Sequence, residues 1–132
     1  MNDSVAEWIE KAEGDFQTAE RELRTRRAPN YDAACFHSQQ CVEKYLKAFL
    51  IQHQISFRLK HDLEILLELI KPISPDFEFL RDLLLLLNDY AVDIRYPGEV
   101  ATKEEARAAI KAMRVVRTFV RQKLGLANQT ER

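Results

Sequence analysis

The chain has 132 residues, of which 46% are apolar and 31% charged, and its formal net charge is −1. This length favours one domain, and this composition is typical of a globular protein rather than of a disordered or fibrous one. With only three Gly and four Pro, long helices are favoured over many short strands. We therefore predict one all-α domain over residues 1–132, with its core at 5–124 and a frayed tail at 125–132.

The N-terminal stretch MNDSVAEW has no basic-then-apolar signal pattern, and no apolar run approaches the roughly 20 residues of a membrane span. A cytoplasmic protein is expected. Cys35 and Cys41 are six residues apart on one predicted helix, so about 9 Å separates them along its axis, which is too far for a disulfide. Both are expected to be reduced packing residues. No histidine at ligand spacing accompanies them, so we expect no metal and no cofactor.

The first predicted helix begins at a capping box, Ser4 to Glu7, and ends near Arg26–Arg27 before Pro29. Its apolar residues recur at helical spacing: Val5, Trp8, Ile9, Ala12, Phe16, Ala19 and Leu23. The second helix is predicted from Tyr31 to Gln52, with Asn30 as its cap.

The second helix has two faces when it is drawn at 100° per residue. Its core face carries Cys35, Val42, Leu46 and Phe49, and nearly opposite lies a polar stripe of His37, Gln40, Lys44 and Lys47. This stripe is either an ordinary solvated face or a site for a phosphate or a nucleotide edge. No Gly-rich loop accompanies it, so the phosphate-binding signal is weak.

Gln39 and Glu43 form an i,i+4 pair near the boundary between these two faces. A covered carboxylate without a partner is costly, so Glu43 is expected to pair with an Arg or Lys from another helix.

A short third helix is predicted from His61 to Lys71, stopping at Pro72, with the His61 imidazole bonded to nearby backbone. The fourth is predicted to start near Pro75 and to continue through Leu83–Leu87, Tyr90 and Ile94 until Pro97 and Gly98 break it. The fifth begins with a second capping box, Thr102 to Glu105, and Gly125 is a suitable stop. Short connections favour antiparallel neighbours, which predicts an up-and-down bundle of four long helices plus one short helix.

The run Leu83–Leu87 is apolar all the way round its helix, which must then be covered on every side. Either a second copy of the chain covers part of it, making a homodimer, or the helix is central in the bundle.

Charge is unevenly distributed along the chain. Residues 62–99 hold nine acidic and three basic side chains, and residues 100–132 hold eight basic and three acidic ones. The two segments could attract each other within the fold or across a dimer, or the basic one could bind nucleic acid. The basic residues of the last helix are expected to form a solvated stripe of Arg107, Lys111, Arg114, Arg117 and Arg121.

Three motifs in order, Gln39-Gln40-x-x-Glu43-Lys44-x-x-Lys47-Ala48, then His61-Asp62-Leu63, then Arg95-Tyr96-Pro97, resemble the HEPN domain family over residues 5–124. This family comprises small helical domains of higher eukaryotes and prokaryotes linked to nucleotide binding. The resemblance implies an antiparallel bundle, usually a homodimer. It also implies a minimal nucleotidyltransferase partner and toxin–antitoxin pairs, and in some branches a metal-independent ribonuclease.

Ribonuclease branches of the family carry an Arg, four to six residues and then a His at the dimer cleft. The histidines of this chain are His37, His53 and His61, and none follows an Arg at that spacing. Arg95 has no histidine after it. Cleavage of that kind needs acid–base help together with charge stabilisation, so the chain is expected not to be an enzyme.

Arg95 and Tyr96 end a predicted helix just before its break, where side chains often line a cleft. Alternatively, Arg95 pairs with Glu43 or Asp93 and Tyr96 caps the core. We predict a non-catalytic HEPN-type interaction module whose candidate ligand-binding residues are His37, Gln40, Lys44, Lys47, Arg95 and Tyr96, the ligand being a nucleotide or RNA. The alternative is a ribonuclease toxin with a non-standard active site.

Overall fold

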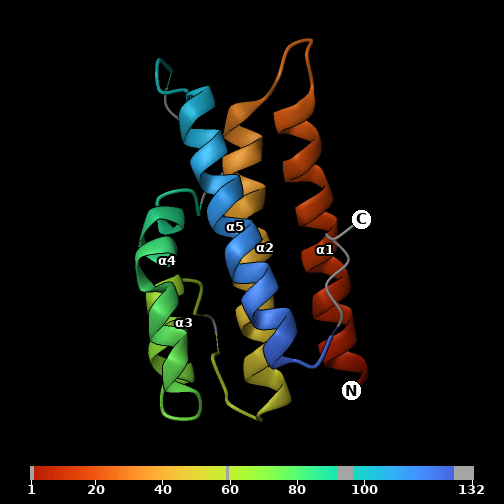
Figure 1. The fold of residues 1–132 in the computed structure, drawn as a ribbon, viewed down its shortest axis with the longest axis vertical. Coiled ribbons are helices and arrows are strands. Elements are labelled where there is room, and N and C mark those ends of the chain that lie inside the picture. The colour runs from red at the N-terminus through yellow and green to blue at the C-terminus, as the bar shows by residue number, and fades with distance from the viewer. Residues whose placement is uncertain (1, 59, 92–96, 127–132) are drawn as a thin grey trace.

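The computed structural model of the chain describes residues 2–58, 60–91 and 97–126. In these ranges it consists of helices without strands: α1 Asp3–Arg24, α2 Tyr31–Gln52, α3 Leu63–Ile70, the 3-10 helix η1 Pro75–Leu80, α4 Arg81–Asn88 and α5 Lys103–Lys123. The long helices α1, α2 and α5 lie side by side, and the short α3 and α4 lie together against one flank (Figure 1). The predicted all-α bundle is confirmed.

Helix α2 is the centre of the bundle. It contacts α1, α3, α4 and α5, and its buried residues include polar ones, Ser38, Gln39, Glu43 and Lys47, as well as its apolar ones. Its predicted bounds are correct, and the Asn30 side chain caps it by accepting a hydrogen bond from the Ala33 amide at 2.9 Å. A helix covered on nearly every side has little room for a purely solvated face.

Helix α1 begins earlier than its predicted capping box. Asn2 is the cap, and its side chain accepts from the Val5 amide at 2.8 Å. Ser4 lies inside the first turn, so the predicted capping box is wrong. Asn and Ser have similar capping preferences, and the choice between them depends on where helical packing against α2 starts.

The segment before α5 differs most from prediction. Helix α3 begins at Leu63 because the Asp62 carboxylate caps it, accepting from the amides of Glu64 and Ile65. The expected long fourth helix is divided into η1 and a two-turn α4, and Tyr90 lies in the turn that follows α4. Ile94 lies outside the described residues. The described part of the bundle therefore has three long and two short α-helices.

Helix α5 has the predicted ends. Thr102 and Glu105 form a complete capping box. At the other end Gly125 has φ +77°, its amide bonds the Gln122 carbonyl, and the Leu126 amide bonds the Arg121 carbonyl. This pair of bonds is a Schellman motif, which needs a left-handed residue and therefore favours glycine.

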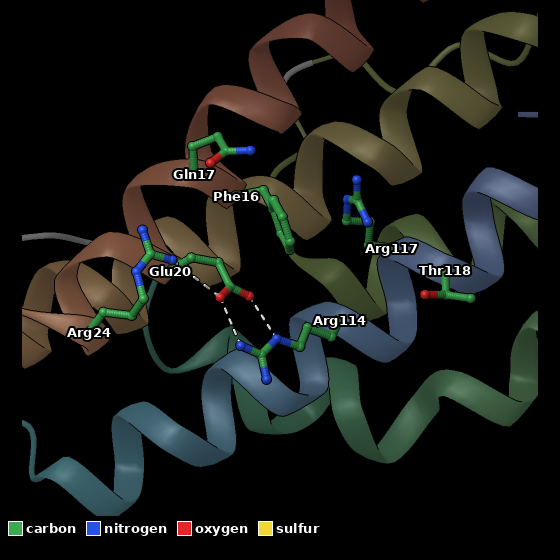
Figure 2. A pocket seen from close by; sticks show the side chains of 7 residues that line it. All are labelled: Phe16, Gln17, Glu20, Arg24, Arg114, Arg117 and Thr118. Atoms are coloured by element: carbon green, nitrogen blue, oxygen red, sulfur yellow. Dashed lines mark hydrogen bonds and ion pairs between the residues drawn. The ribbon is translucent and has the colours of Figure 1, made fainter. Parts of the chain in front are cut away.

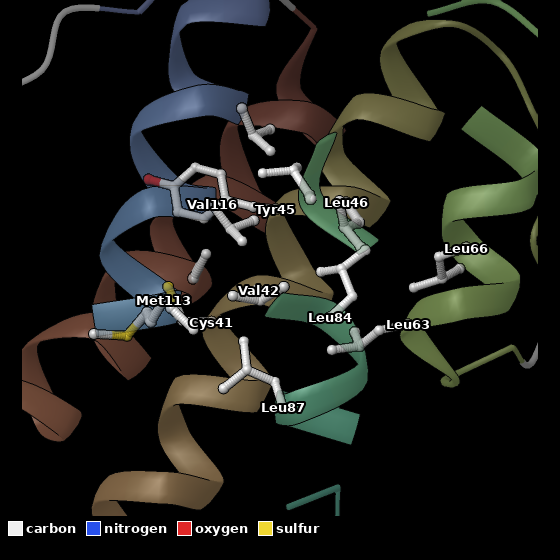
Figure 3. Packing of buried hydrophobic residues seen from close by; sticks show 14 of the residues in the cluster. Cys41, Val42, Tyr45, Leu46, Leu63, Leu66, Leu84, Leu87, Met113 and Val116 are labelled. Carbon is white, nitrogen blue, oxygen red and sulfur yellow. The ribbon is translucent and has the colours of Figure 1, made fainter. Parts of the chain in front are cut away.

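The buried core cluster includes residues of α1 as well as of the other helices. Figure 3 shows the part of it where α2, α4 and α5 meet and α3 closes one side. Leu84 and Leu87 of α4 are fully buried, whereas Leu85 and Leu86 are 43% and 39% exposed. Cys35 and Cys41 are buried and are not joined in a disulfide, as predicted. Within the described residues, no helix is long and apolar enough to cross a membrane.

Candidate functional site

An open hollow of about 460 Å³ lies between α1, α2 and the segment that leads into α3. Trp8 and Phe36 give it aromatic walls, and its polar lining is Gln40, Glu43, Lys44, Lys47 and His61. Three residues of the predicted polar stripe, Gln40, Lys44 and Lys47, therefore meet at this hollow. His37 is not part of its lining.

Glu43 is the carboxylate in the lining of the hollow, and its side chain is 8% exposed. It accepts hydrogen bonds from Lys47 Nζ at 2.8 Å, His61 Nδ1 at 2.8 Å and Gln39 Nε2 at 3.0 Å. Burial raises the pKa of Glu43, but the donors Lys47, His61 and Gln39 outweigh it and hold the pKa below its ordinary value of 4.5. The expected partner from another helix is thus replaced by Lys47, one turn along α2.

Lys47 is a buried ammonium rather than part of a wet face. Its side chain is 5% exposed. Besides Glu43, its Nζ faces the Trp8 and Phe57 rings at 5.5 and 5.2 Å from their centroids. These two rings meet edge to face, with centroids 6.1 Å apart. The ion pair with Glu43 and the cation–π contacts together offset the free-energy cost of removing the Lys47 ammonium from water.

His61 bonds side chains, so the expected bond to nearby backbone is wrong. Its Nδ1 is 2.8 Å from Glu43 Oε2 and 3.0 Å from Lys47 Nζ. An ammonium can only donate and an ionised carboxylate can only accept, so Nδ1 can bond one of the two and not both. The contact with Glu43 is the shorter, so we assign the proton to Nδ1, which donates to Glu43. In the neutral ring Nε2 then keeps its lone pair. The side chain is 63% exposed, which leaves the imidazole accessible to solvent.

Two residues of the polar stripe, His37 and Lys44, contact Asp15 of α1. His37 Nδ1 lies 2.7 Å from Asp15 Oδ1, and Lys44 Nζ lies 2.5 Å from Asp15 Oδ2. Gln40 donates to Gln39 Oε1 at 2.7 Å. The stripe is therefore occupied by contacts within the fold, and the idea of an ordinary solvated face is wrong for most of it. Packing against α1 is the physical reason.

Charge is balanced at the described part of the hollow. Lys44 and Lys47 each have a carboxylate partner, Asp15 and Glu43. Arg95 and Tyr96, the two remaining predicted site residues, lie outside the described residues, and their role stays a prediction. Among the described residues, no group of three or more His, Cys, Asp or Glu is placed to hold a metal ion.

A second hollow, of about 450 Å³, lies between α1 and α5 and contains part of the basic stripe of α5 (Figure 2). Arg114 binds both oxygens of Glu20, at 2.6 and 2.8 Å. Arg117 binds both oxygens of Glu13, and only 5% of its side chain is exposed. Arg121 is also buried and donates to the Tyr45 hydroxyl. The solvated stripe predicted for α5 is therefore wrong at Arg117 and Arg121, which are buried. Arg114 is paired, but 53% of its side chain is exposed, and Arg107 and Lys111 are exposed as well.

Sequence reasoning did not assign Trp8 or Phe36 to a site. Both have apolar neighbours at helical spacing, so they read as core. Their intermediate burial is the only signal that separates them from core residues, and it is not visible in one sequence.

The comparisons with known proteins agree with this helical arrangement. The model of the HEPN domain family matches residues 5–123. A Methanocaldococcus jannaschii protein named "Putative toxin MJ1304" is 32% identical over 139 residues, covering 90% of each chain. The crystal structure of ST0689, an archaeal HEPN homologue, superposes with a TM-score of 0.71 at 25% identity, over 90% of this chain and 96% of that one. TT1696 from Thermus thermophilus has the same fold, with a TM-score of 0.74 at 23% identity over 92% of this chain and 99% of that one.

The order of its helices and the buried polar cluster on its central helix place this chain among the small all-α helical domains. Within that class, the chain belongs to the HEPN domain family.

Proposed function

We propose that this chain is a non-catalytic HEPN-type binding and interaction module. It works in the cytoplasm as a homodimer in a toxin–antitoxin pair, together with a minimal nucleotidyltransferase, and it binds a nucleotide in the hollow beside α2. The toxin name of the Methanocaldococcus jannaschii relative supports the toxin–antitoxin setting. The absence of a histidine at the ribonuclease spacing from any arginine supports a non-catalytic role.

The observation that carries the ligand proposal is the convergence of Gln40, Lys44 and His61 on one hollow with aromatic walls. Lys44 donates to Asp15 and has further N–H groups to offer. Trp8 and Phe36 supply flat apolar surface for a base. The hollow, at about 460 Å³, is within the range of roughly 300–1,000 Å³ that small-molecule sites occupy.

Trp8 is the only tryptophan of the chain, so its fluorescence reports directly on the hollow. We expect titration with ATP or AMP to change Trp8 emission and to release or absorb heat in calorimetry. Adenosine, which lacks phosphate, should bind at least about tenfold more weakly, because a charge-assisted hydrogen bond of roughly 1.5 kcal/mol is lost.

The variant Lys44→Gln should weaken the nucleotide by a similar factor. Lys111→Gln is the matched control, because Lys111 is an exposed lysine of α5 outside the hollow. A folded wild-type protein that gives neither heat nor a fluorescence change with any nucleotide would refute the ligand, and the interaction role alone would be left.

One observation favours the alternative, a ribonuclease with a non-standard site. A carboxylate 2.8 Å from His61 Nδ1 orients an imidazole as in known general bases, and an oriented base could activate a 2′-hydroxyl. Incubation with tRNA and total RNA is the test. We expect no cleavage; cleavage that His61→Ala or Arg95→Ala abolishes would replace the proposal with this alternative.

A further inference from the structure

The hollow of about 450 Å³ between α1 and α5 is lined mainly by hydrogen-bond donors. Arg24, Arg114 and Arg117 bring three guanidiniums to it, and Glu20 is the one carboxylate among the described residues of its lining (Figure 2). Glu13, the partner of Arg117, supplies a second negative charge. Three positive charges against two negative ones leave a surplus of one positive charge, because arginine stays protonated in proteins. The surplus favours a ligand that carries one negative charge.

Arg24 and Arg114 keep donors for such a ligand. Arg114 uses Nε and Nη2 on Glu20, and its Nη1 takes no part in these bonds. Arg24 Nη1 is 3.9 Å from Glu20 Oε1, which is too long for a hydrogen bond. Both guanidiniums are open to solvent, since the side chains of Arg24 and Arg114 are 67% and 53% exposed. A second carboxylate can therefore bond both arginines beside Glu20.

An apolar surface adjoins these guanidiniums. A further hollow, of about 380 Å³, shares Arg114 and Thr118 with the first and continues to Phe79, Val115 and Phe119. Phe79 is 72% exposed and Val115 is 37% exposed. The Phe79 ring stacks on the Phe119 ring, with centroids 6.1 Å apart and planes inclined by 29°. The two hollows together, which we call the α5 groove, thus have a cationic end and an apolar end.

We infer that the α5 groove binds an organic acid with a carboxylate at one end and an apolar chain at the other, the chemistry of a fatty acid. The carboxylate bonds Arg24 and Arg114, and the chain crosses Thr118 to the apolar end. Contact with the chain removes apolar surface from water, on the ligand and on the exposed Phe79 ring alike. The inference goes beyond the proposed function, which concerns the hollow beside α2.

The composition of the α5 groove decides against nucleic acid as its occupant. A phosphate backbone is held by positive charges along several phosphates. Here the surplus is a single charge at one end, and the other end offers mainly phenyl rings and valine. The bonds of 2.6 and 2.8 Å by which Arg114 holds Glu20 already match the guanidinium fork to a planar carboxylate.

Calorimetric titration of the full chain with sodium octanoate tests the inference. We expect octanoate to bind at one site. Acetate, which lacks the chain, and 1-octanol, which lacks the charge, should each bind at least about tenfold more weakly, because each forfeits one end of the groove. No heat with octanoate in the folded wild type would overturn the inference, and so would acetate or octanol that binds as tightly as octanoate.

Variants at each end locate the ligand. Arg24→Gln should weaken octanoate about tenfold through the lost charge-assisted bond, and Phe79→Ser should weaken it about fivefold through lost apolar contact. Arg26→Gln and Val100→Ser are the matched controls, since both residues are exposed and neither lines the groove. Arg24 and Phe79 are exposed themselves, so both variants should keep the helical circular dichroism spectrum. Controls that weaken octanoate as much as the test variants would overturn the inference.

Glu20→Gln gives a result of opposite sign. It removes the negative charge next to the proposed carboxylate and frees the Arg114 fork, so octanoate should bind at least about threefold more tightly. A merely structural role of the Glu20 contact predicts no such gain. Unchanged or weaker binding in a folded Glu20→Gln protein would contradict the placement of the carboxylate.

These outcomes are separable from those of the nucleotide proposal. The α5 groove shares no lining residue with the hollow beside α2, so octanoate should leave the response of Trp8 to nucleotide unchanged. Octanoate that displaces the nucleotide would place the acid in the wrong hollow and overturn the inference. Octanoate binding without any nucleotide response would reject the nucleotide alone.

Discussion

Arg117 of α5 holds Glu13 of α1 through two hydrogen bonds, Nε to Oε2 at 2.7 Å and Nη2 to Oε1 at 2.8 Å. The guanidinium also lies over the Phe16 ring, 4.2 Å from its centroid. Tyr45 of α2 donates its hydroxyl to the same carboxylate. One carboxylate thus joins α1, α2 and α5, the three long helices of the bundle.

Replacing Arg117 by Met should lower the free energy of unfolding by about 3 kcal/mol, because removal of one partner leaves the other charge covered and unpaired. Urea denaturation followed by circular dichroism measures this loss. Arg107→Met on the exposed side of the same helix is the control and should change stability by less than about 0.5 kcal/mol. Equal effects of the two variants would show that the Glu13 contact contributes nothing.

Stability should decrease as the pH falls below about 4.5. Burial raises the pKa of Glu13, but Arg117, Tyr45 and Arg121 outweigh it and lower the pKa in the folded state from its ordinary value of 4.5. The unfolded chain then binds more protons in this range, so acid favours unfolding. Urea midpoints measured between pH 7 and pH 3 should show the decrease, and it should be smaller in Glu13→Gln. An unchanged pH dependence in that variant would contradict the role of Glu13.

The pair Glu43 and Lys47 should show strong coupling. Glu43→Ala alone leaves the buried Lys47 ammonium without its carboxylate, which should cost about 3–5 kcal/mol. Changing both residues to apolar ones of similar size, Glu43→Leu with Lys47→Met, should cost less than either single replacement, because no buried charge is left. Unfolding free energies of the four proteins form a double-mutant cycle, and additivity in it would exclude the coupling.

The cap of α1 can be located by two alanine replacements. Asn2→Ala should lower stability by about 1 kcal/mol, because the Val5 amide loses its acceptor. Ser4→Ala should have little effect, since Ser4 lies within the helix. Thermal or urea unfolding of both variants decides the matter, and a larger loss in Ser4→Ala would restore the capping box predicted from the sequence.

Both thiols should resist modification in the folded protein. Cys35 and Cys41 are buried, and burial raises the pKa of the Cys41 thiol well above its ordinary value, which suppresses the reactive thiolate. Labelling with a thiol reagent such as DTNB should be slow in buffer and complete in denaturant. Rapid labelling of the native protein would indicate that the α2 core opens easily.

The parts of the candidate site that one sequence could predict are those carried by one helix. Gln40, Lys44 and Lys47 follow from the spacing of the second helix, and the pairing of Gln39 with Glu43 follows from i,i+4 neighbourhood. For His61 the sequence predicts a bond to nearby backbone instead, because its partner Glu43 lies 18 residues away, across a loop whose path no local pattern specifies.

Local patterns in the chain were enough to predict the all-α class, the bounds and cap of α2, the capping box of α5 and its glycine stop, since these depend on periodicity and on hydrogen bonds between residues a few positions apart. Which charges are buried, and with which partners, followed only from the packing of the helices. Arg117 and Glu13 are 104 residues apart, and their pairing exists only because α5 packs against α1. The same packing buried Arg117 and Arg121 of the expected solvated stripe, and it left Phe79 and Val115 at the surface.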